Sequence, residues 1–160
     1  MNIKIEKFSE ENAMEVCSWK YEFPYSIYNL PEWDVCQERN LGITKPILRE
    51  KEFRSLYDEG ILMGYFRVSE NKEYLNLGVG LRPKYCGCGY SNIVFPMILK
   101  FIKQNYKNKC IRLVVRNFNK RAIKVYSKFG FYEKGEILVS TPNGDEICKV
   151  MMNSSYIEML

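Results

Sequence analysis

The stretch from Tyr74 to Asn105 constrains the fold most, because it predicts a strand, a glycine-bearing turn and a helix in direct succession. Tyr74–Leu81 alternates apolar residues with small or polar ones, as a half-buried strand does. Asn92–Asn105 carries apolar residues at helical spacing. Between the strand and the helix, Gly87 and Gly89 have no side chains, so the backbone is accessible where the helix begins.

A helix N-terminus has unpaired N–H groups and a partial positive charge, so this turn is suited to an anion such as phosphate. Glycines also occur at such turns for structural reasons alone, because they adopt backbone conformations that other residues avoid. The spacing differs from a dinucleotide fingerprint, since Asn92 stands where a third glycine is needed. No Gly-Lys-Ser/Thr tripeptide occurs, so it is not a P-loop either.

Length and composition favour one domain spanning residues 1–160, since 46% of the residues are apolar. No apolar run approaches the ~18–20 residues that cross a bilayer, and the first residues lack the apolar core of a signal peptide. We therefore expect a cytoplasmic protein without a membrane partner. The net charge of +5 includes no long basic block, so nucleic-acid binding is not expected, while an anionic ligand is compatible.

The chain contains no histidine, which excludes Ser-His-Asp and Cys-His catalysis and histidine–metal chemistry. An acid or base must therefore be Asp, Glu, Tyr, Lys or Cys. The six cysteines show no CxxC spacing, so we expect no metal site and reduced thiols.

The residues before Tyr74 predict a short strand, a helix, an irregular segment and two strands joined by a turn. These are a strand at Ile3–Ile5, a helix capped by Ser9, irregular chain over Asp34–Arg49, and strands at Phe53–Tyr57 and Ile61–Val68. The residues after Asn105 predict a parallel strand, a second helix and a closing strand pair. These are Cys110–Val115, Lys120–Phe129 with Gly130 at its stop, and Phe131–Lys134 with Glu146–Met151, joined by a turn at Pro142–Asp145.

Two features each allow a structural and a functional interpretation. The aromatic, proline-broken segment Trp19–Trp33 is either a loop packed over the core or one wall of a substrate site. Gly78 and Gly80, on the second face of the strand Tyr74–Leu81, indicate either tight packing or a ligand lying along the strand.

Two motifs together make the chain resemble the GNAT superfamily of N-acetyltransferases. The loop Cys86–Ser91, between a strand and a helix, is similar to the family's Arg/Gln-x-x-Gly-x-Gly/Ala coenzyme A loop. The second motif is Asn119-x-x-Ala-x-x-x-Tyr126-x-Lys-x-Gly130-Phe. Cys86 stands where the family usually has Arg or Gln, and Ser91 replaces Gly or Ala.

The resemblance implies acetyl-CoA as donor, a primary amine as acceptor, and a mixed α/β fold with a central, mostly antiparallel sheet and helices on both faces. Backbone N–H groups of the loop would hold the pyrophosphate, and backbone groups of Val79 and Leu81 would hold the pantetheine arm. Asn119 would contact coenzyme A, and Tyr126 would protonate the departing thiolate. The loop residues concerned are Cys86, Gly87, Cys88, Gly89, Tyr90 and Ser91.

The resemblance leaves the general base open, because Leu75–Leu77 offers no carboxylate where family members often have a glutamate. The candidates are Glu22, Glu32, Asp34, Glu73 and Tyr74. Acidic residues near the aromatic segment suit a cationic small molecule, whereas a peptide acceptor would need a groove for its backbone. The runner-up function is a CoA-binding module without catalysis. A homodimer is compatible with the family.

Overall fold

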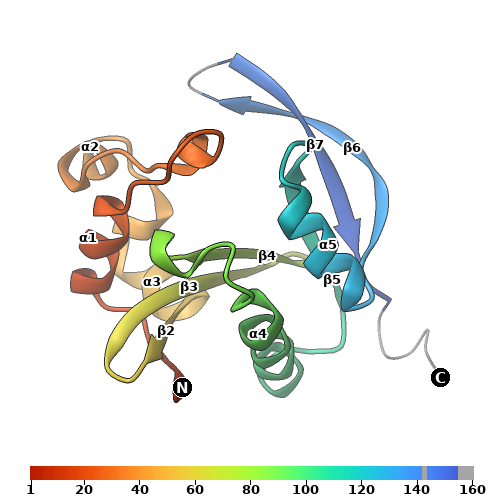
Figure 1. Ribbon diagram of the computed structural model, residues 1–160, viewed down its shortest axis with the longest axis horizontal. Helices are drawn as coiled ribbons and strands as arrows, with labels where there is room; N and C mark the ends of the chain where they lie inside the picture. The colour runs from red at the N-terminus through yellow and green to blue at the C-terminus, as the bar shows by residue number, and fades with distance from the viewer. Residues whose placement is uncertain (142–143, 155–160) are drawn as a thin grey trace. The chain divides into compact units, whose positions relative to one another are not determined.

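The computed structural model describes residues 1–141 and 144–154 of the 160-residue chain. In chain order (Figure 1) the elements are β1 (Ile3–Lys7), α1 (Glu10–Ser18), the 3-10 turn η1 (Tyr25–Tyr28), α2 (Trp33–Glu38), η2 (Gly42–Thr44), α3 (Pro46–Glu52), β2 (Phe53–Asp58), β3 (Ile61–Glu70), β4 (Tyr74–Leu81), η3 (Pro83–Tyr85), α4 (Ser91–Asn105), β5 (Cys110–Arg116), α5 (Lys120–Lys128), β6 (Tyr132–Thr141) and β7 (Gly144–Met152). Within this described part, none of the helices has the length and apolar character that crossing a membrane requires.

The strands follow the order β1-β2-β3-β4-β5-β7-β6 in one sheet. Pairing is antiparallel between β1 and β2, β2 and β3, β5 and β7, and β6 and β7. The pairing of β4 with β5 is parallel and short, running from Tyr74↔Cys110 to Asn76↔Arg112. The predicted mixed α/β class with a mostly antiparallel sheet is confirmed, as is the parallel pair.

The chain divides into two compact units. The first consists of Met1–Arg67 and Val79–Cys88, and the second of Val68–Gly78 and the described residues from Gly89 onward. The last residues of β3 and the first residues of β4 therefore belong to the second unit.

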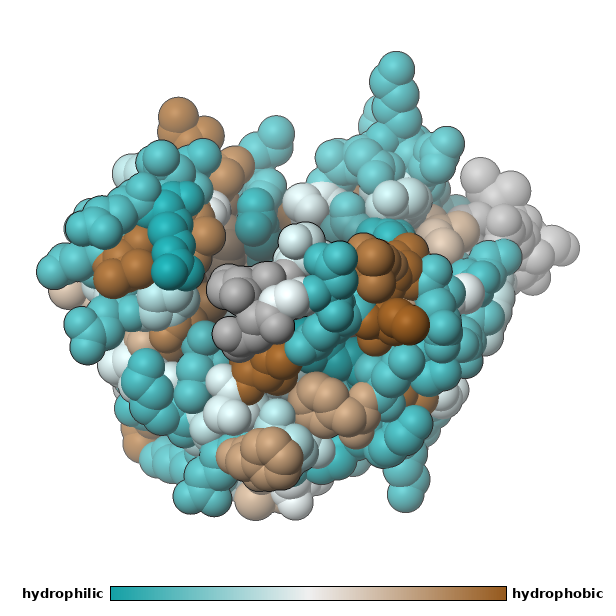
Figure 2. Space-filling model, turned by 90° about the horizontal axis from the view of Figure 1, so that it is seen from above, coloured by the Kyte–Doolittle hydropathy of each residue, from teal (hydrophilic) through white to brown (hydrophobic). Residues whose placement is uncertain are grey.

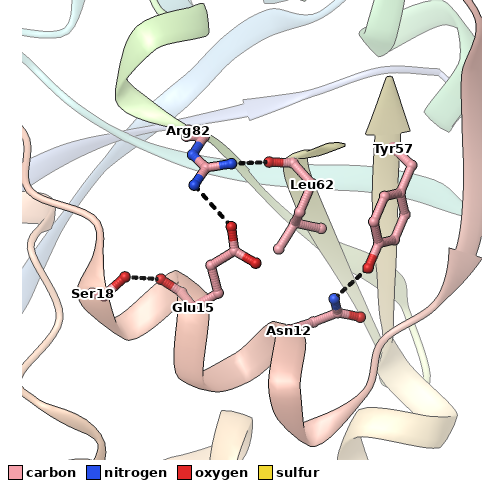
Figure 3. Close-up of polar contacts among 6 residues, drawn as sticks. All are labelled: Asn12, Glu15, Ser18, Tyr57, Leu62 and Arg82. Atoms are coloured by element: carbon pink, nitrogen blue, oxygen red, sulfur yellow. Dashed lines mark hydrogen bonds and ion pairs between the residues drawn. The ribbon is translucent and has the colours of Figure 1, made fainter. Parts of the chain in front are cut away.

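The first unit has a core of apolar residues beneath α1. Ser9 begins this helix with a capping box, because its Oγ accepts from the Asn12 N–H at 3.1 Å and its own N–H donates to Asn12 Oδ1 at 2.9 Å. Asn12 Nδ2 also donates to the Tyr57 hydroxyl at 2.6 Å, which ties α1 to β2 (Figure 3). The buried members of the core are Phe8, Ala13, Val16, Cys17, Trp19, Cys36, Ile43, Phe53 and Leu62.

The second unit has an aromatic cluster centred on Phe95 of α4. Its ring centroid lies 5.0 Å from that of Tyr126 on α5 and 5.6 Å from that of Phe131. At the end of α5, Lys128 Nζ donates to Asn92 Oδ1 in the first turn of α4 at 3.2 Å. Strands β6 and β7 form a long ribbon in Figure 1.

The expectation of irregular chain over Asp34–Arg49 is wrong. The structure has α2, η2 and the start of α3 there, with α2 and α3 only six and seven residues long. Such short helices depend on tertiary burial more than on propensity, and Cys36, Ile43 and Arg49 are buried. Arg49 Nη1 donates to the Ile43 carbonyl at 3.1 Å, which stabilises this segment.

The closing strand pair is confirmed but is longer than expected, since β6 runs to Thr141 and β7 begins at Gly144. Pro142 and Asn143, in the turn expected at Pro142–Asp145, lie outside the described residues.

On the face shown in Figure 2 the described side chains are mostly hydrophilic and the apolar ones lie in separate patches, as expected if the charged residues are solvated.

We predict that Cys17 and Cys36 react slowly with alkylating reagents in the folded protein. Both are buried, their Sγ atoms lie 3.7 Å apart, and burial together with the hydrogen bond to Cys36 raises the pKa of Cys17 to about 12. At pH 8 almost none of the Cys17 side chain is therefore in the reactive thiolate form. Peptide mapping after iodoacetamide treatment measures this, with the exposed Cys88 as the internal control. Labelling of Cys17 as fast as that of Cys88 would contradict it.

Candidate functional site

The carboxyl end of β4 is held by several contacts within the first unit. The Tyr21 hydroxyl donates to the Leu81 carbonyl at 2.7 Å, and the Arg82 N–H donates to the Met63 carbonyl at 2.8 Å. Cys86 Sγ lies 3.6 Å from the same Leu81 oxygen. The Leu81–Arg82 peptide group therefore has partners at both its oxygen and its nitrogen.

The two glycines of β4 differ in their surroundings. A Cβ on Gly80 would lie 2.5 Å from Cε1 of Tyr65, so the ring occupies that space and tight packing explains this glycine. A Cβ on Gly78 would meet nothing within 4 Å among the described residues. On this face of the strand, tight packing therefore applies at Gly80, and the space beside Gly78 stays open among the described residues.

Arg82 connects the end of β4 to α1 and β3 (Figure 3). Its Nη2 lies 2.9 Å from Glu15 Oε1, and its Nη1 donates to the Leu62 carbonyl at 3.2 Å. The positive charge of its guanidinium is therefore paired with a carboxylate. Its observed role is to fix the chain where β4 ends.

The loop that follows leads into α4 through two left-handed glycines. Gly87 has φ +71° and Gly89 has φ +84°, a region that glycine adopts readily. No side chain caps α4. Among the described residues, the N–H groups of Gly87, Cys88, Gly89 and Ser91 donate no hydrogen bond to protein, so these donors are available to an anion.

The remaining predicted residues occupy defined places. Val79 and Leu81 lie in the last three residues of β4, and Cys86–Ser91 forms the loop and the start of α4. Asn119 Oδ1 accepts from the Ala122 N–H at 3.2 Å, which makes Asn119 the N-cap of α5. Tyr126 is half-buried on α5 beside Phe95, in the same unit as Gly89, Tyr90 and Ser91.

Two tyrosines near the end of β4 have shifted pKa values. Burial raises the pKa of Tyr21 above its usual range, and nearby Tyr65 and Cys86 raise it further. Burial, with Cys17 nearby, also raises the pKa of Tyr65 to about 12, although Arg67 opposes the shift. Both hydroxyls therefore stay protonated at neutral pH, and Tyr21 acts as a hydrogen-bond donor, not as a base.

The candidate general bases are exposed or stand at the start of a strand. Glu73 is exposed and immediately precedes the first residue of β4. Tyr74 lies beneath Arg112, whose Cζ is 5.1 Å from the ring centroid. Glu22, Glu32 and Asp34 are exposed, and within the described part of the chain they form no ion pair.

Comparisons with known proteins agree on one family. The profile described as "Acetyltransferase (GNAT) family" matches residues 13–131. The chain therefore belongs to the GNAT acetyltransferase family. No curated protein sequence gives a significant match.

Several solved structures share the fold at low sequence identity. A spermidine N-acetyltransferase SpeG chimera from Vibrio cholerae and hSSAT has 17% identity and a TM-score of 0.75, covering 96% of this chain and 95% of that one. The ribosomal-protein-S18-alanine N-acetyltransferase from Escherichia coli has 16% identity and a TM-score of 0.67, covering 95% and 93%. AAC(6')-Ib in complex with ribostamycin and coenzyme A has 16% identity and a TM-score of 0.71, covering 96% and 94%. At these identities the likeness shows the fold alone.

Sequence reasoning missed the contacts that hold β4, namely those of Tyr21, Tyr65 and Glu15. Tyr21 and Leu81 are 60 positions apart, and no local pattern indicates such a pairing. Gly80 did signal a close approach, but the sequence does not tell which side chain approaches it.

We predict that Gly80→Ala lowers the free energy of unfolding by about 1–3 kcal/mol, because the added methyl group would overlap the Tyr65 ring. Gly78→Ala in the same strand is the matched control, since its methyl group would enter open space, and we expect a change within about 0.5 kcal/mol. Urea unfolding of both variants tests the pair. Equal stability of the two variants would show that Tyr65 moves aside at little cost.

Proposed function

We propose that the protein is an N-acetyltransferase that moves an acetyl group from acetyl-CoA to a primary amine of a small molecule or peptide. The observation that carries the proposal is the loop Cys86–Ser91, whose two left-handed glycines lead into an uncapped helix with unpaired N–H donors. Membership of the GNAT family supports the same donor.

The residues of this loop fit a pyrophosphate. An anion there would accept from the N–H groups of Gly87, Cys88, Gly89 and Ser91 and would gain from the helix dipole of α4. The Cys86 side chain does not weaken this fit, because the donors belong to the backbone. It points back toward the Leu81 and Arg82 carbonyl oxygens, each 3.6 Å from its Sγ.

In the proposed reaction the neutral amine nitrogen attacks the thioester carbonyl carbon, a C–N bond forms, and the C–S bond breaks. Backbone groups of Val79 and Leu81 would hold the pantetheine arm and polarise the thioester carbonyl. Tyr126 would give its hydroxyl proton to the departing thiolate and regain one from solvent water, which takes up the amine proton, and Asn119 would contact coenzyme A. A phenol suits this role, because it is protonated at neutral pH and its ordinary pKa is low enough for it to give up a proton to a thiolate.

The proposed acceptor is a primary amine of undetermined identity. The spermidine and ribostamycin named for two structural neighbours are both small amines, which supports a cationic small molecule. The name of another neighbour points instead to a protein alanine. Exposed carboxylates at Glu22, Glu32, Asp34 and Glu38 give the aromatic segment the charge that a cation requires. None of these groups is assigned as the base, and water can accept the amine proton.

Several finer expectations stay predictions. These are a cytoplasmic location, a single GNAT domain over residues 1–160, a homodimer, and the absence of nucleic-acid, membrane and metal partners. The family match extends over residues of both units, which supports the single domain.

The alternative function is a module that binds acyl-CoA without catalysis, which the missing strand carboxylate favours. Release of free thiol from acetyl-CoA, measured with a panel of polyamines, aminoglycosides and N-terminal peptides, separates the two. Amine-dependent release establishes the transferase. Tight acetyl-CoA binding without release on any amine would favour the module.

We predict that Tyr126→Phe lowers kcat by about 10²-fold, at the lower end of general acid catalysis, while the dissociation constant for CoA changes less than twofold. The substitution keeps the ring that packs against Phe95 and Phe131, so the fold should be retained. Tyr132→Phe, on an exposed tyrosine of β6, is the control. An unchanged kcat in the Tyr126 variant would make this tyrosine a packing residue.

A further inference from the structure

Several contacts fix the carboxyl end of β4. Leu81 O accepts from the Tyr21 hydroxyl at 2.7 Å, Arg82 N–H donates to Met63 O at 2.8 Å, and the Tyr65 ring fills the space beside Gly80. These contacts come from Tyr21, which follows α1, and from Met63 and Tyr65 of the neighbouring strand β3. All of them lie within the first unit.

Among these contacts, the one from Tyr21 is a side-chain hydrogen bond that a single substitution can remove. Tyr21 lies in the segment after α1, and its own N–H donates to Asn29 Oδ1 at 2.7 Å, which fixes the backbone on which it sits. Its hydroxyl is part-buried, and burial raises its pKa, so it keeps its proton at neutral pH and donates to Leu81. The hydrogen bond therefore links this segment to the end of β4.

We propose that Tyr21 is a positioning residue for acetyl transfer: by holding the Leu81 carbonyl, it fixes the backbone that presents the thioester to the amine. This inference rests on the proposed function, because it assigns the last residues of β4 to the pantetheine arm. Tyr21 touches neither reacting atom and acts through Leu81.

This positioning role predicts that loss of the Tyr21 hydroxyl changes kcat more than it changes the affinity for CoA. The loop donors at Gly87 and beyond bind the anionic part of acetyl-CoA, and none of them is bonded to Tyr21. Loss of the Tyr21 hydroxyl therefore leaves affinity for CoA nearly intact, whereas a shift of the Leu81 peptide misplaces the thioester carbonyl and slows the chemical step.

The test is Tyr21→Phe, which removes the hydroxyl and keeps the ring. We expect kcat to fall about five- to tenfold, as loss of one neutral hydrogen bond would give, with the dissociation constant for CoA and the KM for the amine each within about twofold. Tyr57→Phe is the matched control, because its hydroxyl also has a close partner, Asn12 Nδ2 at 2.6 Å, in the same unit but away from the end of β4. It should lose comparable thermal stability and keep kcat.

Hydrogen–deuterium exchange at the Arg82 amide makes the test independent of turnover. In the Tyr21→Phe protein this amide should exchange faster, and in Tyr57→Phe it should not. Faster exchange together with a kcat loss confined to Tyr21→Phe supports the proposal. Equal kcat in the two variants, or unchanged exchange at Arg82, overturns it. If the wild-type protein turns over no amine while exchange responds as expected, the proposed function fails and the structural link stands.

Discussion

The structure depends on how the chain is held where β4 ends, because the same few residues terminate a strand and begin the loop that leads to α4. The Leu81–Arg82 peptide is bonded at its oxygen by Tyr21 and at its nitrogen by Met63. Arg82 then extends the anchoring through its side chain to Glu15 of α1. These contacts fix the chain just before Gly87 and Cys88, whose N–H groups belong to the proposed anion site, and a backbone fixed in advance lowers the cost of binding.

The glycines around this point have distinct physical reasons. Gly64 and Gly80 exist because other atoms occupy the space of their missing side chains, since a Cβ on Gly64 would lie 2.7 Å from the Gly80 carbonyl oxygen. Gly87 and Gly89 instead allow left-handed backbone, which turns the chain into α4. Gly64 and Gly80 therefore allow close packing at β4, and substituting them should change the free energy of unfolding. Gly87 and Gly89 set the conformation of the loop, and substituting them should change ligand binding.

Local patterns were enough to predict the strand, loop and helix, since alternation over Tyr74–Leu81 and the apolar spacing of α4 lie within single elements. The Asn119 and Tyr126 motif was visible for the same reason. The helices α2 and α3 were missed, because six or seven residues carry too little periodicity and their stability comes from buried partners elsewhere. The link from Tyr21 to Leu81 spans 60 positions, and only the folded chain reveals it. The sequence offered several candidates for the general base and did not single out one of them.

Thermal unfolding with and without excess acetyl-CoA tests the central claim that the loop before α4 binds the donor. At about 100 times the dissociation constant, binding should stabilise the fold by roughly 2.7 kcal/mol and raise the Tm by about 5–10 °C, whereas ATP and NAD should have little effect. Gly89→Glu should abolish the rise through bulk and charge, and Gly89→Ala, which carries the same backbone strain at φ +84°, should retain it in part. A folded wild-type protein, free of copurified CoA and with no rise in Tm, would contradict the account and leave the loop a structural turn.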